Sequence, residues 1–280
     1  MSEKEYAAAR LTDEERVRLV QHQKRRSDYQ LTMLSIIGVL GFLILWQVAV
    51  AAGWLPSRYV PMPSRVVELF FEKWMDPNPD GATLGLHILS SLQVALTGFG
   101  LAIVIGVPLG LLMGWFRAFD KFMRPIFEIL RPIPPVSWIP ITILWLGVGL
   151  KAKAFIVFFS AFVPCVINAY TGIRQTSPVL INFSKTCGAS TFTIFRKIGI
   201  PSAMTMTFAG IRVALGNAWA TLVAAEMLAA STGLGYMIQQ GRQFARPDII
   251  ILGIVVIGAI GVLFTSLLGR IEYKVLGWKK

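Results

Sequence analysis

Long apolar blocks are the feature that most limits what this chain can fold into. Apolar stretches of about 20 residues recur along the sequence, and short segments rich in charged side chains separate them. A helix of about 20 residues is roughly 30 Å long, which matches the hydrocarbon layer of a bilayer. Hydrophobic residues make up 55% of the chain and charged residues only 15%, whereas a soluble domain is usually about one quarter charged. The chain is therefore predicted to be an integral membrane protein.

Six membrane spans are predicted from the positions of these blocks. They cover residues 31–52, 88–115, 131–149, 154–170, 203–230 and 249–268. Each is expected to be a helix, because a helix satisfies its backbone hydrogen bonds internally in lipid. The predicted fold class is all-α, a polytopic membrane protein of about six transmembrane helices. Residues 1–30 are predicted to form a charged cytoplasmic segment, and residues 31–280 the transmembrane domain.

The distribution of basic residues predicts the orientation of the chain. Six spans place both termini on the same side of the membrane. If that side is the cytoplasm, 19 of the 27 Lys and Arg residues lie in inner segments and seven in outer segments. This bias favours cytoplasmic termini. It also accounts for the net charge of +12 without a nucleic-acid partner, because the basic residues are not interleaved with aromatic residues in one stripe.

Four prolines interrupt the predicted third span within residues 131–140. Proline removes backbone donors and breaks helices. Irregular backbone at membrane depth survives where protein buries it or where it borders an aqueous cavity. Pro134, Pro135 and Trp138 are therefore candidates for lining a pathway. The alternative is a kinked entry of the span at the inner interface.

The predicted fifth span carries polar and aromatic candidates for the same pathway. Asn217 and Trp219 lie near its middle and Glu226 toward its outer end. Charged residues within membrane segments are costly and usually functional. Glu226 is therefore a candidate gate residue or contact for an external partner. The alternatives are a Glu226 side chain that snorkels to the outer boundary and tryptophans that face lipid or the interface.

A polar, basic segment lies between the predicted fourth and fifth spans. The loop covers about residues 172–201, and it is longer than a simple turn requires. It is predicted to lie in the cytoplasm and to contact a separate protein. The basic candidates for this contact are Lys185, Arg196 and Lys197. For the three basic side chains, the alternative is the ordinary excess of positive charge in cytoplasmic loops.

Catalytic motifs are absent from the sequence. It has no Gly-x-x-x-x-Gly-Lys-Ser/Thr phosphate loop, and its two histidines, His22 and His87, form no recognisable metal or triad pattern. The chain is therefore predicted to be a conduit and not an enzyme, with no metal or cofactor of its own. The energy for transport would come from a partner or from an ion gradient.

The loop resembles a motif of a known family. Gly188, followed by Ile198 and Pro201, is similar to the "EAA" loop of the permease subunits of ABC importers, which reads Glu-Ala-Ala-x-x-x-Gly, nine residues, then Ile-x-x-Pro. Residues 182–184 are Asn-Phe-Ser, so the Glu-Ala-Ala triplet is missing. Residues 131–149 and 214–239 resemble permeases of the nitrate, sulfonate, taurine and bicarbonate group, and most of all its taurine permeases. The similarity covers about residues 56–270.

The resemblance implies a type I ABC importer in a bacterial inner membrane. Two permease copies would form the pore, and the loop would supply cytoplasmic coupling helices. The resemblance adds the motif matches Gly188, Ala189, Ser190, Ile198 and Pro201 to the candidate coupling residues. Two ATPase subunits carrying ATP and Mg²⁺ would dock on these helices, and an extracytoplasmic solute-binding protein would deliver a small anion such as taurine, another sulfonate, nitrate or a carboxylate. The alternative is a secondary transporter driven by an ion gradient, which would need an inverted repeat and ion-coordinating broken helices.

Overall fold

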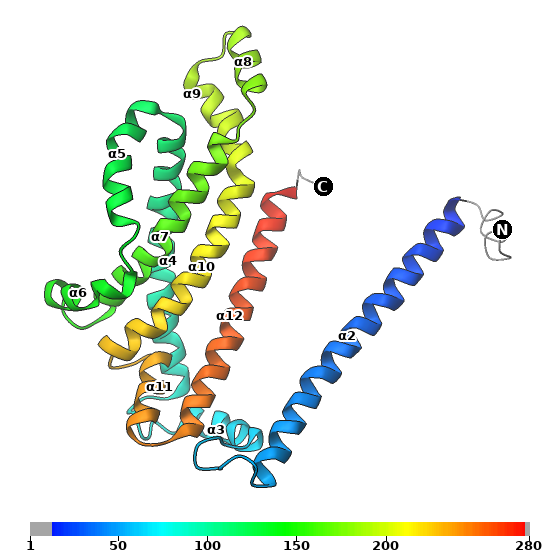
Figure 1. Ribbon diagram of the computed structural model, residues 1–280, viewed down its shortest axis with the longest axis vertical. Helices are drawn as coiled ribbons and strands as arrows, with labels where there is room; N and C mark the ends of the chain where they lie inside the picture. The colour runs from blue at the N-terminus through cyan, green and yellow to red at the C-terminus, as the bar shows by residue number, and fades with distance from the viewer. Residues whose placement is uncertain (1–12, 278–280) are drawn as a thin grey trace. The chain divides into compact units, whose positions relative to one another are not determined.

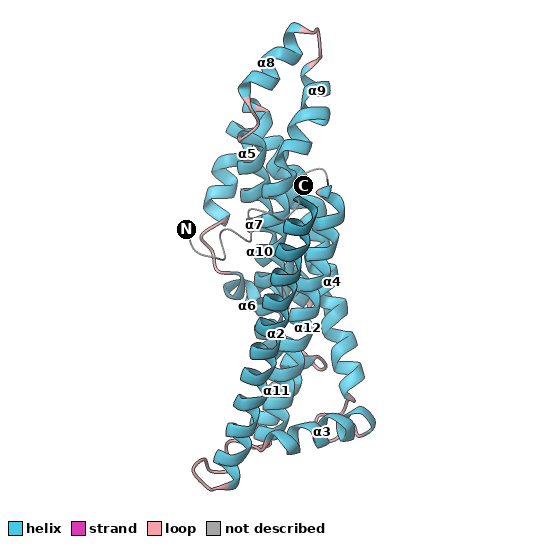
Figure 2. Cartoon of the chain, turned by 90° about the vertical axis from the view of Figure 1, so that its right-hand side faces the viewer, coloured by secondary structure: helices cyan, strands magenta, loops and turns pink. Residues whose placement is uncertain are grey.

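Helices make up all the regular secondary structure in the described part of this computed structural model, as predicted (Figure 2). The structure describes the backbone of residues 13–277 and the side chains within it, except those of residues 13–30, 32 and 229. The chain divides into two compact units, one up to Arg65 and one from Val66 onward. Each unit is described by itself.

The first unit consists mainly of one long helix, α2 (Asp13–Ala51). Its apolar part, Met33–Ala51, is long enough to cross a membrane. The helix begins well before the span predicted to start at residue 31. Residues 13–30 contain no glycine or proline and many strong helix formers, so nothing in them ends the helix.

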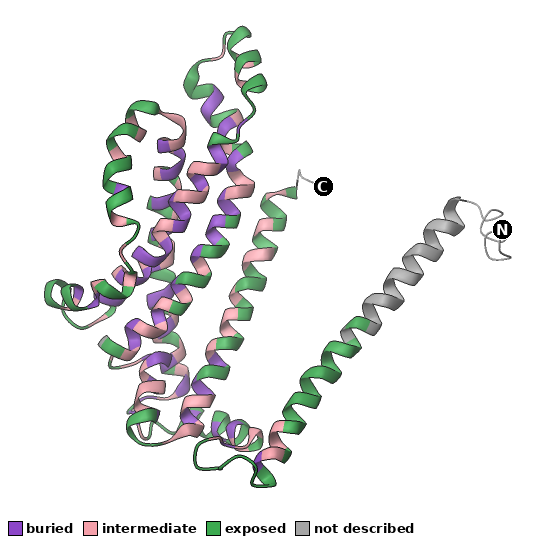
Figure 3. Ribbon diagram, in the orientation of Figure 1, coloured by how far each residue is buried: buried purple, intermediate pink, exposed green. Residues whose placement is uncertain are grey.

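Three long helices form the centre of the second unit: α4 (Leu84–Trp115), α7 (Leu150–Arg174) and α10 (Ile200–Ala229). They lie side by side, and their buried residues face one another (Figures 1 and 3). The shared core is rich in small side chains, including Ala102, Ala161 and Ala214. Small residues let membrane helices approach closely, and dispersion contacts between them replace the hydrophobic drive that is missing in lipid.

Glycines on α4 set its distance from α7. A Cβ added at Gly98 would lie 2.6 Å from the carbonyl oxygen of Ala154, and one at Gly110 would lie 2.4 Å from that of Val166. Close approach at such glycines was expected from the sequence. Gly100 does not take part, because a Cβ there would meet nothing within 4 Å.

Three more helices complete one end of this unit. They are α3 (Pro63–Met75), α11 (Leu234–Gln243) and α12 (Pro247–Val275). Val66 and Leu69 of α3 share a buried cluster with Met237 of α11 and Leu252 of α12. Short helices therefore precede the predicted second and sixth spans, as α3 and α11.

The third span is a bent pair of helices. It consists of α5 (Arg117–Leu130), a 3-10 turn η1 (Pro135–Trp138) and α6 (Ile139–Leu146), with a bend of 84° between α5 and the rest. The prediction that the span starts at residue 131 was wrong, because it treated the charges from Arg117 to Arg124 as a loop. A single residue, Phe116, separates α5 from α4. The predicted break at the prolines is confirmed.

Six spans are consistent with the described residues. Five single helices in them are long and apolar enough to cross a membrane, and the bent pair makes a sixth. In Figure 1, α5 lies beside the upper parts of α4 and α7, and α6 turns away from them.

Candidate functional site

A helical hairpin projects beyond α4, α7 and α10 at one end of the second unit (Figure 1). It consists of α8 (Pro178–Thr186) and α9 (Thr191–Ile194), joined at Gly188. Gly188 has a φ of +78°, a left-handed conformation that glycine adopts without steric cost. Its N–H donates to the carbonyl of Lys185 at 2.9 Å, and the Ala189 N–H donates to that of Ser184 at 3.0 Å. This pair of hydrogen bonds is a Schellman motif, which ends α8 and turns the chain.

Ser190 starts the second helix of this hairpin. Its hydroxyl oxygen accepts a hydrogen bond from the Thr193 N–H at 3.2 Å, which caps α9. The helix continues through a π-helical turn, η2 (Phe195–Gly199), into α10. The fifth span was predicted to start at residue 203, just after Pro201, but the helical run begins earlier, at Thr191. Pro201 cannot donate a backbone hydrogen bond. The wider π turn η2, which includes Ile198 and lies just before Pro201, accommodates the change in the backbone hydrogen-bond pattern.

The base of the hairpin is anchored in the core, and its tip is exposed. Phe195 packs against Trp115, with ring centroids 5.6 Å apart, and belongs to a buried cluster. On α8 and α9, by contrast, Phe183 is 67% exposed and Phe192 is 65% exposed, with Val179 also exposed. Exposed apolar side chains grouped on a projecting element mark an interaction surface. The sequence analysis did not select these residues, although apolar side chains in a segment predicted to lie in water were a signal.

Basic side chains lie near this hairpin. Arg117, Arg174 and Lys185 line a cavity of about 400 Å³ beside the base of α9. Arg196 and Lys197 are exposed on η2. The predicted basic character of the loop is therefore spread over two faces.

A second cavity, of about 350 Å³, brings together two of the predicted pathway residues. Pro135 and Asn217 line it, together with Ser160, Thr221 and Arg131. Ser160 and Thr221 join α7 to α10 through a hydrogen bond between their hydroxyls at 2.8 Å. Arg131 was not among the predicted pathway residues, although it is the first residue of the predicted third span.

The other predicted pathway residues lie elsewhere. Pro134 precedes η1, and Trp138 ends it with its ring 5.2 Å from that of Phe159. Trp219 lies on another side of α10, where its Nε1 donates to the carbonyl of Ile257 at 3.1 Å and its ring packs on Phe264.

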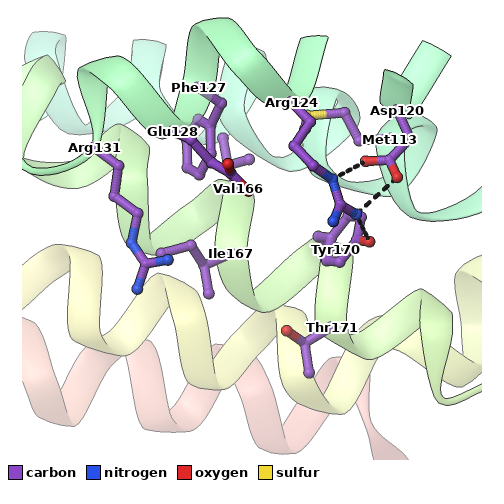
Figure 4. Close-up of a pocket in the computed structure, with 10 residues that line it drawn as sticks. All are labelled: Met113, Asp120, Arg124, Phe127, Glu128, Arg131, Val166, Ile167, Tyr170 and Thr171. Carbon is purple, nitrogen blue, oxygen red and sulfur yellow. Dashed lines mark hydrogen bonds and ion pairs between the residues drawn. The ribbon is translucent and has the colours of Figure 1, made fainter. Parts of the chain in front are cut away.

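A third cavity lies between α5 and α7 and has a volume of about 240 Å³ (Figure 4). Arg124 forms an ion pair with Asp120, at 2.7 Å between Nη2 and Oδ2, and donates a hydrogen bond to the hydroxyl of Tyr170. Arg131 also borders this cavity, but its side chain points away from the Asp120–Arg124 pair.

Glu226 is fully buried and does not snorkel to the membrane boundary. The hydroxyl of Ser91 on α4 lies 2.8 and 2.9 Å from its two carboxylate oxygens, and the Gly235 N–H donates to it at 2.9 Å. A Cβ on Gly233, whose φ is +132°, would lie 2.4 Å from the carboxylate carbon. Glu226 therefore fastens the connection between α10 and α11 to α4. Its role in transport stays a prediction.

A chain of buried polar groups continues from this carboxylate. The Gly233 N–H donates to Nδ1 of His87 at 3.1 Å, and Nε2 of His87 lies 3.1 Å from Oδ2 of Asp80. Asp80 also forms an ion pair with buried Lys73. Burial alone would raise the pKa of Asp80, but hydrogen bonds from His87 and Lys73 and the positive charge of Lys73 lower the pKa below its ordinary value. The loop before α4 is thus held by a carboxylate that favours its charged form.

Replacing Asp80 with asparagine is expected to lower the free energy of unfolding by about 3 kcal/mol at pH 7, because Lys73 would be left buried without its counter-charge. A lowered pKa means that this contribution is present at neutral pH and is lost as the pH falls through the folded-state value, below about 3.8. Thermal unfolding in detergent measures the effect, expected as a Tm lower by about 5–10 °C. Asp76→Asn, in the exposed part of the same loop, is the control. An equal Tm for wild type and Asp80→Asn would contradict the prediction.

Comparison with known proteins decides the family. Residues 106–277 match the family model described as "Binding-protein-dependent transport system inner membrane component". The chain belongs to this family. The match covers more than half of the sequence, including the hairpin and both cavities near Arg131. The predicted membership in the ABC permeases is thereby confirmed, and the chain is a multi-pass inner-membrane subunit of a transporter.

Several curated permeases are similar over most of their length. A probable ABC transporter permease of Brucella abortus is 34% identical, over 91% of this chain and 98% of the relative. The taurine transport permease TauC of Escherichia coli is 30% identical, over 86% and 88%. The bicarbonate transport permease CmpB of Synechocystis is 34% identical, over 86% of each.

Solved structures support the fold. A chain of the inward-facing MetNI methionine ABC transporter superimposes with a TM-score of 0.61 at 21% identity, covering 69% of this chain and 95% of that one. The all-helical membrane fold expected from the sequence is therefore confirmed.

Proposed function

We propose that this chain is the permease of an ATP-driven importer for a small anion. The class of anion includes taurine and other sulfonates, nitrate, and bicarbonate or other carboxylates. Relatives named for taurine and for bicarbonate transport support this class. The Arg131–Asn217 cavity adds support, because it contains a cation and hydroxyl groups and no carboxylate.

The hairpin of α8 and α9 is the proposed docking site for the ATPase subunits. The single observation that carries this assignment is the projecting hairpin itself, with its Schellman turn at Gly188 and exposed Phe183 and Phe192. Phe183 occupies the position of the family's Glu-Ala-Ala triplet. An apolar contact would there replace the acidic one, while Lys185, Arg196 and Lys197 would meet acidic or carbonyl groups.

The remaining parts of the proposal follow from this arrangement. Two ATPase subunits hold ATP and Mg²⁺, and two copies of the chain enclose the pathway. The hairpin and both termini lie in the cytoplasm, in agreement with the bias in basic residues. The opposite end, with α3 and α11, then receives the solute-binding protein.

Uptake into proteoliposomes that contain the assembled complex tests the function. ATP with liganded binding protein is expected to drive uptake of at least one solute from a panel of taurine, alkanesulfonates, nitrate, bicarbonate and aromatic carboxylates. An ATPase-deficient complex is the control. Uptake that follows a proton or sodium gradient and ignores ATP would overturn the proposal in favour of a secondary transporter.

A further inference from the structure

We propose that the cavity lined by Arg131, Ser160, Asn217 and Thr221 holds the translocated anion within the membrane, and that the Arg131 guanidinium neutralises its charge. This inference rests on the proposed function, but it adds a binding site and a residue that carries the selectivity.

The position of Arg131 is the first observation. Helix α5 starts directly after the end of α4 and runs back beside α4 and α7 for 14 residues (Figure 1). At about 1.5 Å per residue, its far end lies roughly 21 Å from its start. Arg131 follows that end, and it shares a cavity with Asn217 from the middle of α10. Because Asn217 lies near the middle of α10, the proposal places this cavity and the exposed Arg131 side chain that lines it within the membrane, where charge is costly and usually functional.

The second observation is that the exposed Arg131 guanidinium forms no ion pair with a described residue, although Glu128 borders one of the same cavities. Among the described residues, none forms a hydrogen bond or ion pair with the Arg131 side chain. Arg124, seven residues earlier on α5, is by contrast paired with Asp120 and Tyr170. Figure 4 shows the Arg131 side chain directed away from that pair, toward α7 and α10. An unpaired guanidinium in a polar cavity is a ready partner for an anion.

The third observation is the chemistry of the cavity wall. The hydroxyls of Ser160 and Thr221 already bind each other, and the exposed Asn217 amide faces the same space. A guanidinium presents a planar fork of donors that matches two oxygens of a sulfonate, nitrate or carboxylate. The volume of about 350 Å³ lies at the small end of the range for ligand pockets. The broken backbone contributes Ile133 and Pro135 to the cavity wall, and irregular backbone within a membrane typically borders cavities.

Charge-selective labelling tests the site without knowledge of the substrate. The permease complex carries Asn217→Cys in a background with Cys165→Ala and Cys187→Ser. It is treated with an anionic and a cationic methanethiosulfonate reagent of similar size. Arg131 is expected to favour the anionic reagent, so Arg131→Gln should lower the anionic-to-cationic rate ratio about tenfold. Arg131→Lys should keep most of the preference.

Lys121→Gln is the control. It removes an exposed cation from α5 and should leave the anionic-to-cationic rate ratio unchanged. An equal ratio with and without Arg131 would overturn the proposal, as would an Asn217→Cys variant that neither reagent can reach. If Arg131→Gln fails to assemble, the test is protection from labelling in the Asn217→Cys variant that retains Arg131. Taurine or nitrate at millimolar concentration is then expected to slow labelling at least threefold, and no slowing would overturn the proposal.

Transport separates this inference from the function on which it rests. In a wild-type complex that imports an anion, Arg131→Gln is expected to reduce uptake at least tenfold while the binding protein still stimulates ATP hydrolysis. Undiminished uptake by Arg131→Gln would overturn the site alone. A wild-type complex that imports nothing with ATP would overturn the proposed function, and the labelling ratio would still decide the charge at Asn217.

Discussion

Replacing Gly188 with valine is expected to abolish coupling to the ATPase subunits while leaving the membrane helices folded. Gly188 has a φ of +78° and supplies one of the two hydrogen bonds that end α8. A β-branched residue is a genuine outlier in this region, at a cost of about 1–2 kcal/mol or more. A Cβ at Gly188 would meet nothing within 4 Å, so the cost is conformational and confined to the turn. The orientation of α8 relative to α9 would change.

The measurement is copurification of the ATPase subunits with the permease, together with ATP hydrolysis stimulated by the binding protein. Both are expected to fall at least tenfold, with the Tm of the permease changed by no more than about 2 °C. Gly188→Asn is the matched control, because asparagine tolerates the left-handed conformation better than other residues with a side chain. Normal copurification and stimulation by Gly188→Val would remove the docking role of this hairpin.

Replacing Gly110 with valine should have the largest effect on folding. Its Cβ would lie 2.4 Å from the carbonyl oxygen of Val166 and 2.9 Å from the Cβ of Ala169. The obstacle is the backbone of α7, which cannot rotate away, so α4 and α7 must separate. The loss of contact along these two helices is expected to exceed 3 kcal/mol, because overpacking alone typically costs 1–3 kcal/mol.

The yield of monodisperse protein in detergent measures this effect, and Gly110→Val is expected to give little or none. Gly100→Val, on the same helix, is the matched control because a Cβ there meets nothing within 4 Å. Equal yields for the two variants would show that the close approach of α4 and α7 is not required.

The boundaries of the third span show why one prediction succeeded in part. Prolines break a helix through local covalent geometry, so the break between residues 131 and 140 could be predicted. The helix before it was missed, although Phe119, Met123 and Phe127 recur at helical spacing among its charges. Only the tertiary structure shows that Arg124 pairs with Tyr170, which is 46 residues away, as well as with Asp120.

The candidate site was also predictable only in part. Residue type was enough to select Asn217 and Glu226, since polar groups are rare in such spans. The side chains that surround them could not be predicted from the sequence. Ser91, which binds the Glu226 carboxylate, is 135 residues away in the sequence. Arg131 was not selected, because its cavity forms only when α5, α7 and α10 pack together.

The sequence by itself determined that the chain enters a membrane, that its spans are helices and that prolines break the third of them. These properties follow from the length of apolar blocks and from the backbone geometry of single residues, and both act locally. Only the tertiary structure decided that Glu226 is a buried fastening, that Arg131 faces a polar cavity and that Phe183 is exposed. Those outcomes depend on which distant side chains fill the space around each residue, and the composition of the chain does not determine that.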